Sequence, residues 1–371
     1  MTISPLRVCI ILGTRPEAIK LAPVIQTFQQ DPAFETQVVL TGQHREMVAQ
    51  VMDLFDLQAN HDLAIMQHGQ TLTDITCRSL RGLEELFQQL QPQIVLVQGD
   101  TTTAFAAALA AFYQQIPVGH VEAGLRTDNI YNPYPEEANR RLISQITQLH
   151  FAPTTLSVEN LERSGVVGKI YHTGNTVIDA LLNVAARHPD CPVPGLDWNQ
   201  YRVILSTVHR RENWGKPLRD IAEGFLQVLD KFPDTALLLP LHRNPTVREP
   251  LQAILGNHPR VFLTEPLDYS ELVGAIQRSY LLLTDSGGLQ EEAPSLGKPV
   301  LVLRETTERP EAVMAGTAKL VGTRSTAIAE AAGRLLSQPA AYQEMANAIN
   351  PFGDGHASER IAEAVKAYIS R

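Results

Sequence analysis

The chain is poor in cysteine and has no long apolar run. Its three cysteines, Cys9, Cys77 and Cys191, lie far apart and lack the spacing of a zinc site or of a disulfide framework. No segment approaches the length of a membrane-spanning helix, and a strand at Arg7–Leu12 begins without the charged and apolar segments of a signal peptide. We therefore expect no structural disulfide, no bound metal and no membrane association, and we expect the protein in the cytoplasm.

Positive charge is also scarce. Lys and Arg number 31 against 40 Asp and Glu, which gives a net charge of −9, and no Lys/Arg-rich run occurs. A nucleic-acid-binding protein needs a basic surface, so this class of function is excluded, and any bound anion should be small and held locally. The 371 residues suffice for two domains, each with its own core.

Short apolar runs alternate with amphipathic stretches along the whole chain. The runs are RVCIIL, TQVVLT, QIVLVQ, IPVGHV and LHFA in the first half, and VILSTV, TALLLP, RVFL, YLLLTD and PVLVL in the second. This alternation is typical of βαβ units, in which helices cover both faces of a parallel sheet. Because the series occurs twice, the sequence predicts an α/β fold of two Rossmann-like domains with parallel sheets.

A Pro-rich stretch, His188–Trp198, separates the two series and follows a helical segment at Asn175–Ala186. Its weak pattern suits an interdomain connection. We predict an N-terminal domain over residues 1–175 and a C-terminal domain over residues 176–371. An amphipathic helix is expected at Ala357–Tyr368.

The segment GTRPEAIK leaves the first strand and turns into a helix. Arg15 and Lys20 would offer positive charge to a diphosphate at the carboxyl end of the sheet. A tight turn with two solvated cations explains the segment equally well. It matches neither GxGxxG nor the Walker A pattern, which disfavours NAD and ATP.

Three acids lie on successive loops of the first half. Asp100 in GDTTT, taken alone, is slightly better explained as a helix N-cap. Glu122 in HVEAGLRT and Glu136 in PEEANRR then occupy similar positions. Because ligands of open α/β sheets bind at the carboxyl edge, three acids there together indicate a site.

Two histidines follow strands of the second half, His209 in HRREN and His242 in LHRNP. A lone histidine is more often structural, but one at a carboxyl strand end is suited to donate to phosphate or to move a proton. LHRNP is equally explained as a polar turn.

The stretch TDSGGLQEEAPSLGKP follows an apolar run and enters a predicted helix. Ser286 and the N–H groups of Gly287 and Gly288 would hold a diphosphate at the helix start. Glu292, one turn later, would accept hydrogen bonds from ribose hydroxyls. Arg309 in ERPEA supplies either a further cation or a solvated helix start.

The ordered set of motifs resembles the non-hydrolysing UDP-N-acetylglucosamine 2-epimerase family. It comprises GTRPEAIK, TGQHREM, GDTTT, HVEAGLRT, PEEANRR, TGNTVIDAL, HRREN, TDSGGLQEEAPSLGKPVLVLRETTERPEA and NPFGDG, and runs from about residue 7 to the last helix. The resemblance implies a two-domain fold of the glycosyltransferase-B type with the active site in the interdomain cleft. It also implies a homodimer, and a last helix, at about residues 357–371, that packs back onto the first domain.

The resemblance further implies residue roles. The catalytic set would be Asp100, Glu122, Glu136 and His209. The UDP contacts would be Arg15, Lys20, Arg140, Ser286, Gly287, Gly288 and Glu292. An activating second molecule of UDP-N-acetylglucosamine would contact Gln43, Gln70, Arg210 and His242, although Gly69 stands where some members have a basic residue and Glu46 where some have Gln. No cofactor and no metal are implied.

The chemistry explains why such a site needs both acids and cations. The hydrogen at C2 of the sugar is not beside a carbonyl, so its direct removal faces a large barrier. If the C1–O bond to UDP breaks first, the C2 proton becomes removable and a glycal forms. Cations and helix-end N–H groups would stabilise the leaving diphosphate, and carboxylates would exchange protons at C2 on opposite faces.

Other functions share parts of this pattern. A glycosyltransferase would share the fold and the UDP site, but it usually needs fewer acids around the anomeric carbon. A hydrolysing epimerase would differ in how well water is excluded. A non-catalytic nucleotide-sugar sensor would have lost one or more acids, and none is missing. Specificity for a diacetamido uronic acid sugar also remains open.

Overall fold

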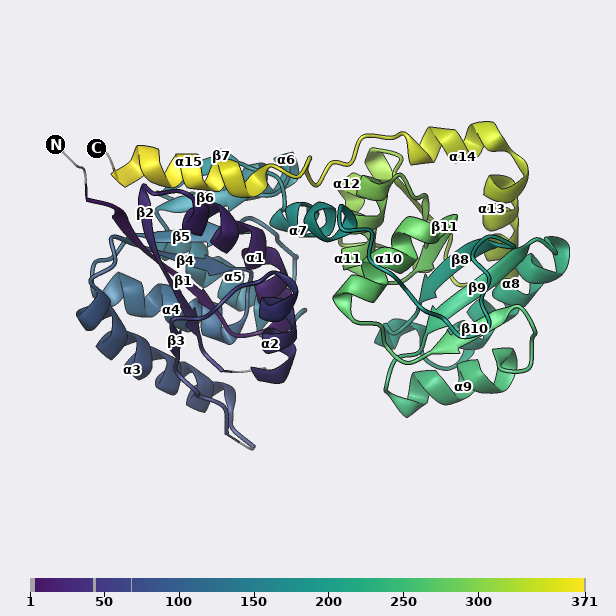
Figure 1. The fold of residues 1–371 in the computed structure, drawn as a ribbon, viewed down its shortest axis with the longest axis horizontal. Helices are drawn as coiled ribbons and strands as arrows, with labels where there is room; N and C mark the ends of the chain where they lie inside the picture. Colours follow the sequence, from purple (N-terminus) through teal and green to yellow (C-terminus); the bar gives the residue numbers. More distant parts are fainter. Residues whose placement is uncertain (1–3, 43–44, 68, 370–371) are drawn as a thin grey trace. The chain divides into compact units, whose positions relative to one another are not determined.

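The computed structural model describes residues 4–42, 45–67 and 69–369. The chain divides into two compact units, Met1–Ala180 with Phe352–Arg371 (unit 1) and Leu181–Pro351 (unit 2). Figure 1 shows that each unit contains its own sheet with helices around it. In the part of the chain that the structure describes, no helix is both long enough and apolar enough to cross a membrane.

Unit 1 contains a seven-stranded sheet with strand order β3-β2-β1-β4-β5-β6-β7, and every neighbouring pair is parallel. The strands are β1 (Leu6–Leu12), β2 (Phe34–Leu40), β3 (His61–Asp62), β4 (Ile94–Gln98), β5 (Val118–Val121), β6 (Leu149–Ala152) and β7 (Lys169–His172). The helices are α1 (Arg15–Gln30), α2 (Arg45–Leu54), α3 (Leu72–Leu90), α4 (Thr102–Tyr113), α5 (Glu136–Ile146) and α6 (Thr155–Arg163), with α15 (Ala357–Ile369) from the end of the chain. Helix α7 (Thr176–Ala185) runs from unit 1 into unit 2.

The central strands of unit 1 are buried along their whole length. All five residues of β4 are buried, as are five of the seven in β1. Parallel strands covered on both faces read as continuous apolar runs, and this is why the pattern of the sequence predicted them. Helix α4 packs against α3, and its buried alanines allow the close approach.

The last segment of the chain belongs to unit 1. Helix α15 packs against α1, and the yellow α15 lies beside the purple α1 in Figure 1. The backbone N–H of Asn175 donates to the carbonyl of Phe352 at 2.6 Å, and the N–H of Ser358 donates to Asp179 at 2.7 Å. These bonds fix the start of α15 to the start of α7.

Unit 2 contains a six-stranded sheet, also wholly parallel, with order β10-β9-β8-β11-β12-β13. Its strands are β8 (Arg202–Thr207), β9 (Thr235–Pro240), β10 (Val261–Thr264), β11 (Leu281–Thr284), β12 (Val300–Val302) and β13 (Ala318–Leu320). Its α-helices are α8 (Lys216–Lys231), α9 (Pro245–Leu255), α10 (Tyr269–Arg278), α11 (Gly287–Glu292), α12 (Pro310–Met314), α13 (Ser325–Ser337) and α14 (Pro339–Ala346), and its 3₁₀ helices are Arg211–Asn213 and Ala293–Leu296. Two parallel sheets confirm the predicted α/β fold class.

The Pro-rich stretch at residues 188–198 lies inside unit 2, so the structure corrects its interpretation as an interdomain connection. It packs against α10, where a Cβ on Gly274 would come within 2.5 Å of the carbonyl oxygen of Pro189. Cys191 is buried, and the guanidinium of Arg278 lies 4.6 Å from the centre of the Trp198 ring. Composition alone does not distinguish such a packed segment from a linker.

His120 in β5 predicts a pH dependence of stability. The side chain is buried beside the carbonyl of Gly99, at 2.7 Å, and burial lowers the pKa of His120 to about 4. Between its ordinary pKa of 6.5 and about 4, the unfolded chain binds a proton that the folded chain does not, so stability falls as pH falls through this window. We expect this histidine to contribute a loss of about 2 kcal/mol between about pH 6.5 and about pH 5, at about 1.4 kcal/mol per pH unit.

Urea unfolding of the wild-type protein and of His120→Asn at about pH 7.5 and about pH 5 measures this contribution. The variant should lose about 2 kcal/mol less of its unfolding free energy on acidification than the wild type does. Equal losses would show that His120 is not held neutral in the fold.

Candidate functional site

Asp100 lies two residues after the end of β4 and is not the N-cap of α4. Thr101 is the cap, and its hydroxyl accepts a hydrogen bond from the N–H of Ala104 at 3.0 Å. The Asp100 carboxylate instead accepts from Nε and Nη2 of Arg140, both at 2.7 Å. The N-cap explanation of Asp100 is therefore wrong, and its carboxylate is held by a cation from α5.

Glu122 lies directly after β5, the next strand of the sheet. Its side chain is only 5% exposed and lies 2.5 Å from Nζ of Lys20. The same carboxylate accepts from the side-chain amides of Asn175, at 3.2 Å, and of Gln98. Because Gln98 ends β4, this bond places Glu122 beside the loop that carries Asp100. Glu122 has a left-handed backbone (φ 62°), which is uncommon for a residue other than glycine.

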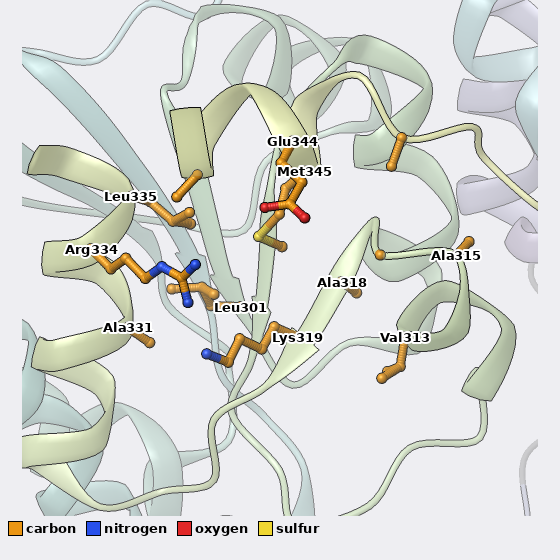
Figure 2. Close-up of a pocket in the computed structure, with 13 residues that line it drawn as sticks. Leu301, Val313, Ala315, Ala318, Lys319, Ala331, Arg334, Leu335, Glu344 and Met345 are labelled. Atoms are coloured by element: carbon orange, nitrogen blue, oxygen red, sulfur yellow. The ribbon is translucent and has the colours of Figure 1, made fainter. Parts of the chain in front are cut away.

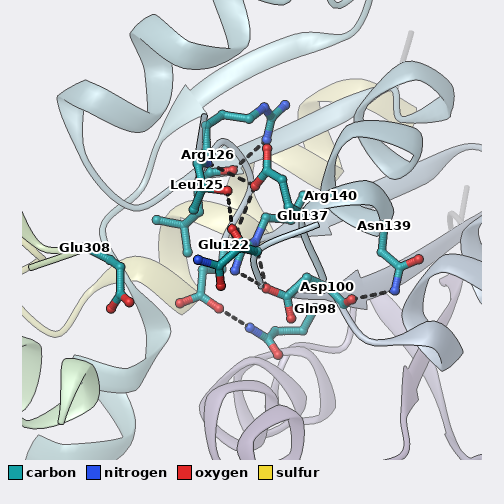
Figure 3. A network of polar contacts seen from close by, with 12 residues as sticks. Gln98, Asp100, Glu122, Leu125, Arg126, Glu137, Asn139, Arg140 and Glu308 are labelled. Atoms are coloured by element: carbon teal, nitrogen blue, oxygen red, sulfur yellow. Dashed lines mark hydrogen bonds and ion pairs between the residues drawn. The ribbon is translucent and has the colours of Figure 1, made fainter. Parts of the chain in front are cut away.

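Glu136 begins α5, and one of its carboxylate oxygens, Oε2, is buried without a hydrogen-bond partner among the described residues. Its neighbour Glu137 is fully buried and accepts from Arg140 at 3.1 Å and from Arg141 at 2.8 Å. Figure 3 shows the resulting chain from Asp100 through Arg140 to Glu137. Helix α5 therefore carries an unpartnered acid and, one turn later, the cation that holds Asp100.

The predicted cations of unit 1 thus have different surroundings. Lys20 and Arg140 pair with Glu122 and Asp100, two of the predicted catalytic acids. Arg15 begins α1 and has no ion pair within the described part of the chain. Two of the three cations assigned to UDP therefore neutralise acids in this structure, while Arg15 keeps its charge available to an anion.

In unit 2, the buried carboxylate of Asp285 organises the loop after β8. It accepts from the backbone N–H groups of His209 and Arg210, at 3.0 and 2.9 Å, and from the side chain of Asn213 at 3.0 Å. It also lies 3.3 Å from Nδ1 of His209. Burial lowers the pKa of His209, and the negative charge of Asp285 opposes this. The neutral imidazole is therefore favoured, and a neutral imidazole can accept a proton.

His209 and His242 lie together in one pocket of unit 2. Their rings stack with centres 5.9 Å apart. The pocket has a volume of about 230 Å³ and is also lined by Ser286 and Glu292. Glu292 accepts a hydrogen bond from the hydroxyl of Tyr269 at 3.0 Å. The structure thus brings four of the predicted residues into one cavity.

The two adjacent glutamates of α11 have separate surroundings. Glu292 faces the pocket, whereas Glu291 is buried and pairs with Arg309. Arg309 is the N-cap of α12, so the predicted helix start is confirmed. Its side chain is only 17% exposed and pairs with Glu291, so the prediction that it is solvated is wrong. Gly287 begins α11, where an added Cβ would lie 3.5 Å from Nη2 of Arg210, so this arginine reaches the predicted diphosphate turn.

The four residues assigned to an activator are not brought together by the described contacts. Gln43 lies outside the described residues. Gln70 belongs to unit 1, where its side-chain oxygen Oε1 accepts from Arg78 at 3.1 Å. Arg210 and His242 belong to unit 2. His242 also accepts from the backbone N–H of Asn244 at 3.1 Å, as expected of a polar turn.

Three buried acids around these residues were not assigned from the sequence. Glu137 and Asp285 hold predicted site residues, as described above. Glu17 accepts from the N–H groups of Gly13 and Thr14, at 2.8 and 2.7 Å, and from the Thr101 hydroxyl at 2.5 Å. Burial raises the pKa of Glu17. The spacing Thr14-x-x-Glu17 is that of a capping box, a signal by which this residue could have been found.

A second pocket of unit 2 contains no predicted site residue. It lies beside β13, α13 and α14, has a volume of about 400 Å³ and includes Lys319, Arg334 and Met345 (Figure 2). Among the described residues, no group of three or more His, Cys, Asp or Glu side chains is arranged to hold a metal ion.

The chain is similar to known proteins over nearly its whole length. Residues 26–366 match the family model described as UDP-N-acetylglucosamine 2-epimerase. The UDP-N-acetylglucosamine 2-epimerase of Escherichia coli O157:H7 is 50% identical, covering 97% of this chain and 98% of that protein. The crystal structure of UDP-GlcNAc 2-epimerase from Neisseria meningitidis, bound to UDP-GlcNAc, is similar with a TM-score of 0.87 and 48% identity, covering 98% of this chain and all of that one (100%).

A more distant structure shows the fold alone. Sucrose-phosphate synthase from Thermosynechococcus elongatus has a TM-score of 0.66 at 11% identity, covering 98% of this chain and 99% of that one. Two wholly parallel sheets and this likeness define the class, a two-domain α/β protein with glycosyltransferase-B-type architecture. Within that class, the chain belongs to the UDP-N-acetylglucosamine 2-epimerase family, whose members are isomerases.

Proposed function

We propose that the protein is a non-hydrolysing epimerase that reversibly interconverts UDP-N-acetylglucosamine and UDP-N-acetylmannosamine. The arrangement of acids in unit 1 supports this proposal most directly. Asp100 and Glu122 follow neighbouring strands at one sheet edge, and each pairs with a cation. Glu136 begins the helix that supplies the cation of Asp100 and leaves a carboxylate oxygen without a partner. A nucleotide-binding protein without sugar chemistry would not need three such acids.

The proposed reaction begins with cleavage of the C1–O bond to UDP. In unit 2, the turn at residues 286–288 and His209 would bind the departing diphosphate, with Arg210 beside Gly287. In unit 1, Arg15 would add its unpaired charge. Lys20 and Arg140 would move part of their attraction from the acids to the diphosphate, which would leave those acids more basic as the reaction proceeds.

Removal of the C2 proton then gives the glycal, and protonation from the other face followed by readdition of UDP gives the epimer. Asp100, Glu122 and Glu136 would share these proton transfers. The electron pair of the C2–H bond forms the C1–C2 double bond, and the pair of the C1–O bond leaves with UDP. Readdition reverses both changes, so no redox cofactor is consumed and UDP stays bound throughout.

The remaining expectations are part of the same proposal. The protein would act in the cytoplasm as a homodimer and supply UDP-N-acetylmannosamine for surface polysaccharide or cell-wall polymer synthesis. A second substrate molecule would act as an activator through Arg210, His242 and the residues of unit 1 named for it.

Proton NMR in D₂O tests the proposed reaction. The purified protein is incubated with UDP-N-acetylglucosamine, with a chelator and without added NAD. We expect UDP-N-acetylmannosamine carrying deuterium at C2. Release of free N-acetylmannosamine and UDP would instead indicate a hydrolysing epimerase, and an unchanged substrate would favour a transferase or the uronic acid sugar.

Glu292→Ala is expected to weaken UDP binding by roughly tenfold, because a buried carboxylate that accepts ribose hydroxyls is lost. Its loss also removes the acceptor of Tyr269. Isothermal titration with UDP measures the change, and Glu330→Ala, at an exposed site of α13, serves as the control. Unchanged affinity would assign Glu292 a purely structural role beside Tyr269.

A further inference from the structure

Three arginines from three different segments line one pocket of unit 1. The pocket has a volume of about 480 Å³, within the usual range of small-molecule sites. Arg126 comes from the loop after β5, Arg141 from α5 and Arg163 from α6. Among the described residues that line it, Asp128 is the only acid. In a protein of net charge −9, this pocket therefore has a local excess of positive charge.

Arg126 is half-buried and has no carboxylate partner among the described residues. Its Nη1 donates to the carbonyl of Leu125 at 2.8 Å and its Nη2 to the hydroxyl of Ser144 at 2.9 Å, both neutral acceptors. Its Nε is buried and has no hydrogen-bond partner among the residues that the structure describes. Burial lowers the pKa of Arg126, although a guanidinium still remains charged near neutral pH. The charge of Glu137 acts on Arg126 without a direct contact. A partly buried cation whose direct partners are all neutral is costly, and a bound anion would reduce that cost.

Poorly exposed arginines of this protein differ in whether an acid neutralises them. Arg140 contacts two carboxylates, those of Asp100 and Glu137, and Arg304 also contacts two, those of Glu212 and Glu308. Arg260, in contrast, donates only to backbone carbonyls within the described part of the chain, as Arg126 donates only to neutral acceptors.

The other two arginines line the same pocket. Arg141 shares the carboxylate of Glu137 with Arg140, so its charge is only partly offset, and its side chain is 47% exposed. Arg163 is 66% exposed, and its nearest carboxylate, that of Glu159, is 3.8 Å away. Guanidinium groups bind carboxylates and phosphates through paired hydrogen bonds, so three of them around one cavity suit several acidic groups at once.

We propose that this pocket binds a small polyanion with two or more carboxylate or phosphate groups. None of the residues assigned to UDP or to catalysis lines it, so the site is additional to the one proposed for the substrate. A single acidic group would contact only part of the arginine set, so the number of acidic groups should determine affinity.

Isothermal titration of the full chain tests this proposal, with citrate as the tricarboxylate probe and inorganic phosphate as the single-group probe. Saturating UDP is present, so that the residues assigned to the diphosphate do not contribute. We expect saturable citrate binding at one site per chain, with phosphate binding at least roughly tenfold more weakly. No citrate binding, or equal affinities for the two probes, would overturn the proposal.

Two variants locate the site. Arg163→Gln should weaken citrate binding by roughly tenfold, and Gln145→Glu, which adds a carboxylate to the lining, should abolish it. Both positions are exposed, so the fold should be retained. The control is Arg81→Gln, which removes an equal charge from an exposed site of α3. Citrate binding that is unaffected by Gln145→Glu, or equally weakened by Arg81→Gln, would show that citrate binds elsewhere.

Sedimentation of the same variants separates a ligand site from a contact between chains. One outcome is that Gln145→Glu changes the oligomeric state while neither the wild type nor any variant binds citrate. The arginines would then pair with acidic side chains of a second copy of the chain, and the proposed ligand site would be refuted.

Discussion

Asp100→Asn is expected to reduce turnover by roughly 10²- to 10⁴-fold, the usual contribution of a group that transfers protons in the transition state. The change preserves the shape of the side chain and removes its charge and basicity. UDP affinity should remain nearly unchanged, because Asp100 is not assigned to UDP and the amide oxygen of Asn can still accept the hydrogen bond from Arg140. A large effect on kcat without one on UDP binding would place Asp100 among the groups that act on the sugar.

Three measurements define this result. Turnover is followed by the NMR assay in D₂O, UDP affinity by isothermal titration, and folding by urea unfolding. Asp53→Asn, on the exposed face of α2, is the matched control and should leave turnover unchanged. If Asp100→Asn retains turnover while Asp53→Asn does the same, Asp100 does not belong to the catalytic set. Deuterium exchange at C2 without epimerisation would show instead that Asp100 serves only one of the two faces.

The sheets could be predicted from sequence because their signal is local. The run IVLVQ is fully buried in β4, and the run LLLT is fully buried in β11, since helices cover both faces. The positions of Asp100 and Glu122 at strand ends follow from the same pattern. Topology then brings them to one edge of the sheet, because all the strands are parallel.

The pairing of the site residues depends on contacts that no local pattern records. Lys20 and Glu122 are separated by 102 residues, and Asp100 and Arg140 by 40. The residues around a lysine or arginine in the sequence do not show whether its side chain is solvated or is paired with a catalytic acid. The roles of Asp100 and Thr101 were also ambiguous, since both residues are good N-caps and only the backbone geometry selects Thr101. Long-range electrostatics therefore had to come from the structure.

The two adjacent glutamates of α5 are expected to have different effects when each is changed to Gln. The change at Glu137 should mainly lower stability, and the change at Glu136 should mainly lower turnover. Glu137 is fully buried and neutralises Arg140, whose side chain is only 15% exposed. Removing its charge should lower the free energy of unfolding by about 2–4 kcal/mol, since Arg140 and Arg141 lose a shared counter-charge. Glu136 has a carboxylate oxygen without a partner, so Glu136→Gln should change stability by less than about 1 kcal/mol.

Activity should show the reverse order. Glu136→Gln should lower kcat by roughly 10²-fold or more if this acid exchanges a proton with the sugar. Glu137→Gln should lower it less, provided that both variants are assayed where they are folded, because Arg140 keeps its contacts with Asp100. Each variant therefore serves as the control for the other, since both remove one negative charge from the first turn of the same helix.

Urea unfolding and the NMR assay of the two variants make the comparison. Equal losses of stability would mean that Glu136 is paired in solution despite its unpartnered oxygen. A larger loss of kcat in Glu137→Gln would transfer the catalytic assignment from the first glutamate to the second. In the expected pattern, two adjacent residues have different roles. Glu137 provides the buried negative charge that stabilises the fold, and Glu136, which has an oxygen without a partner, transfers the proton.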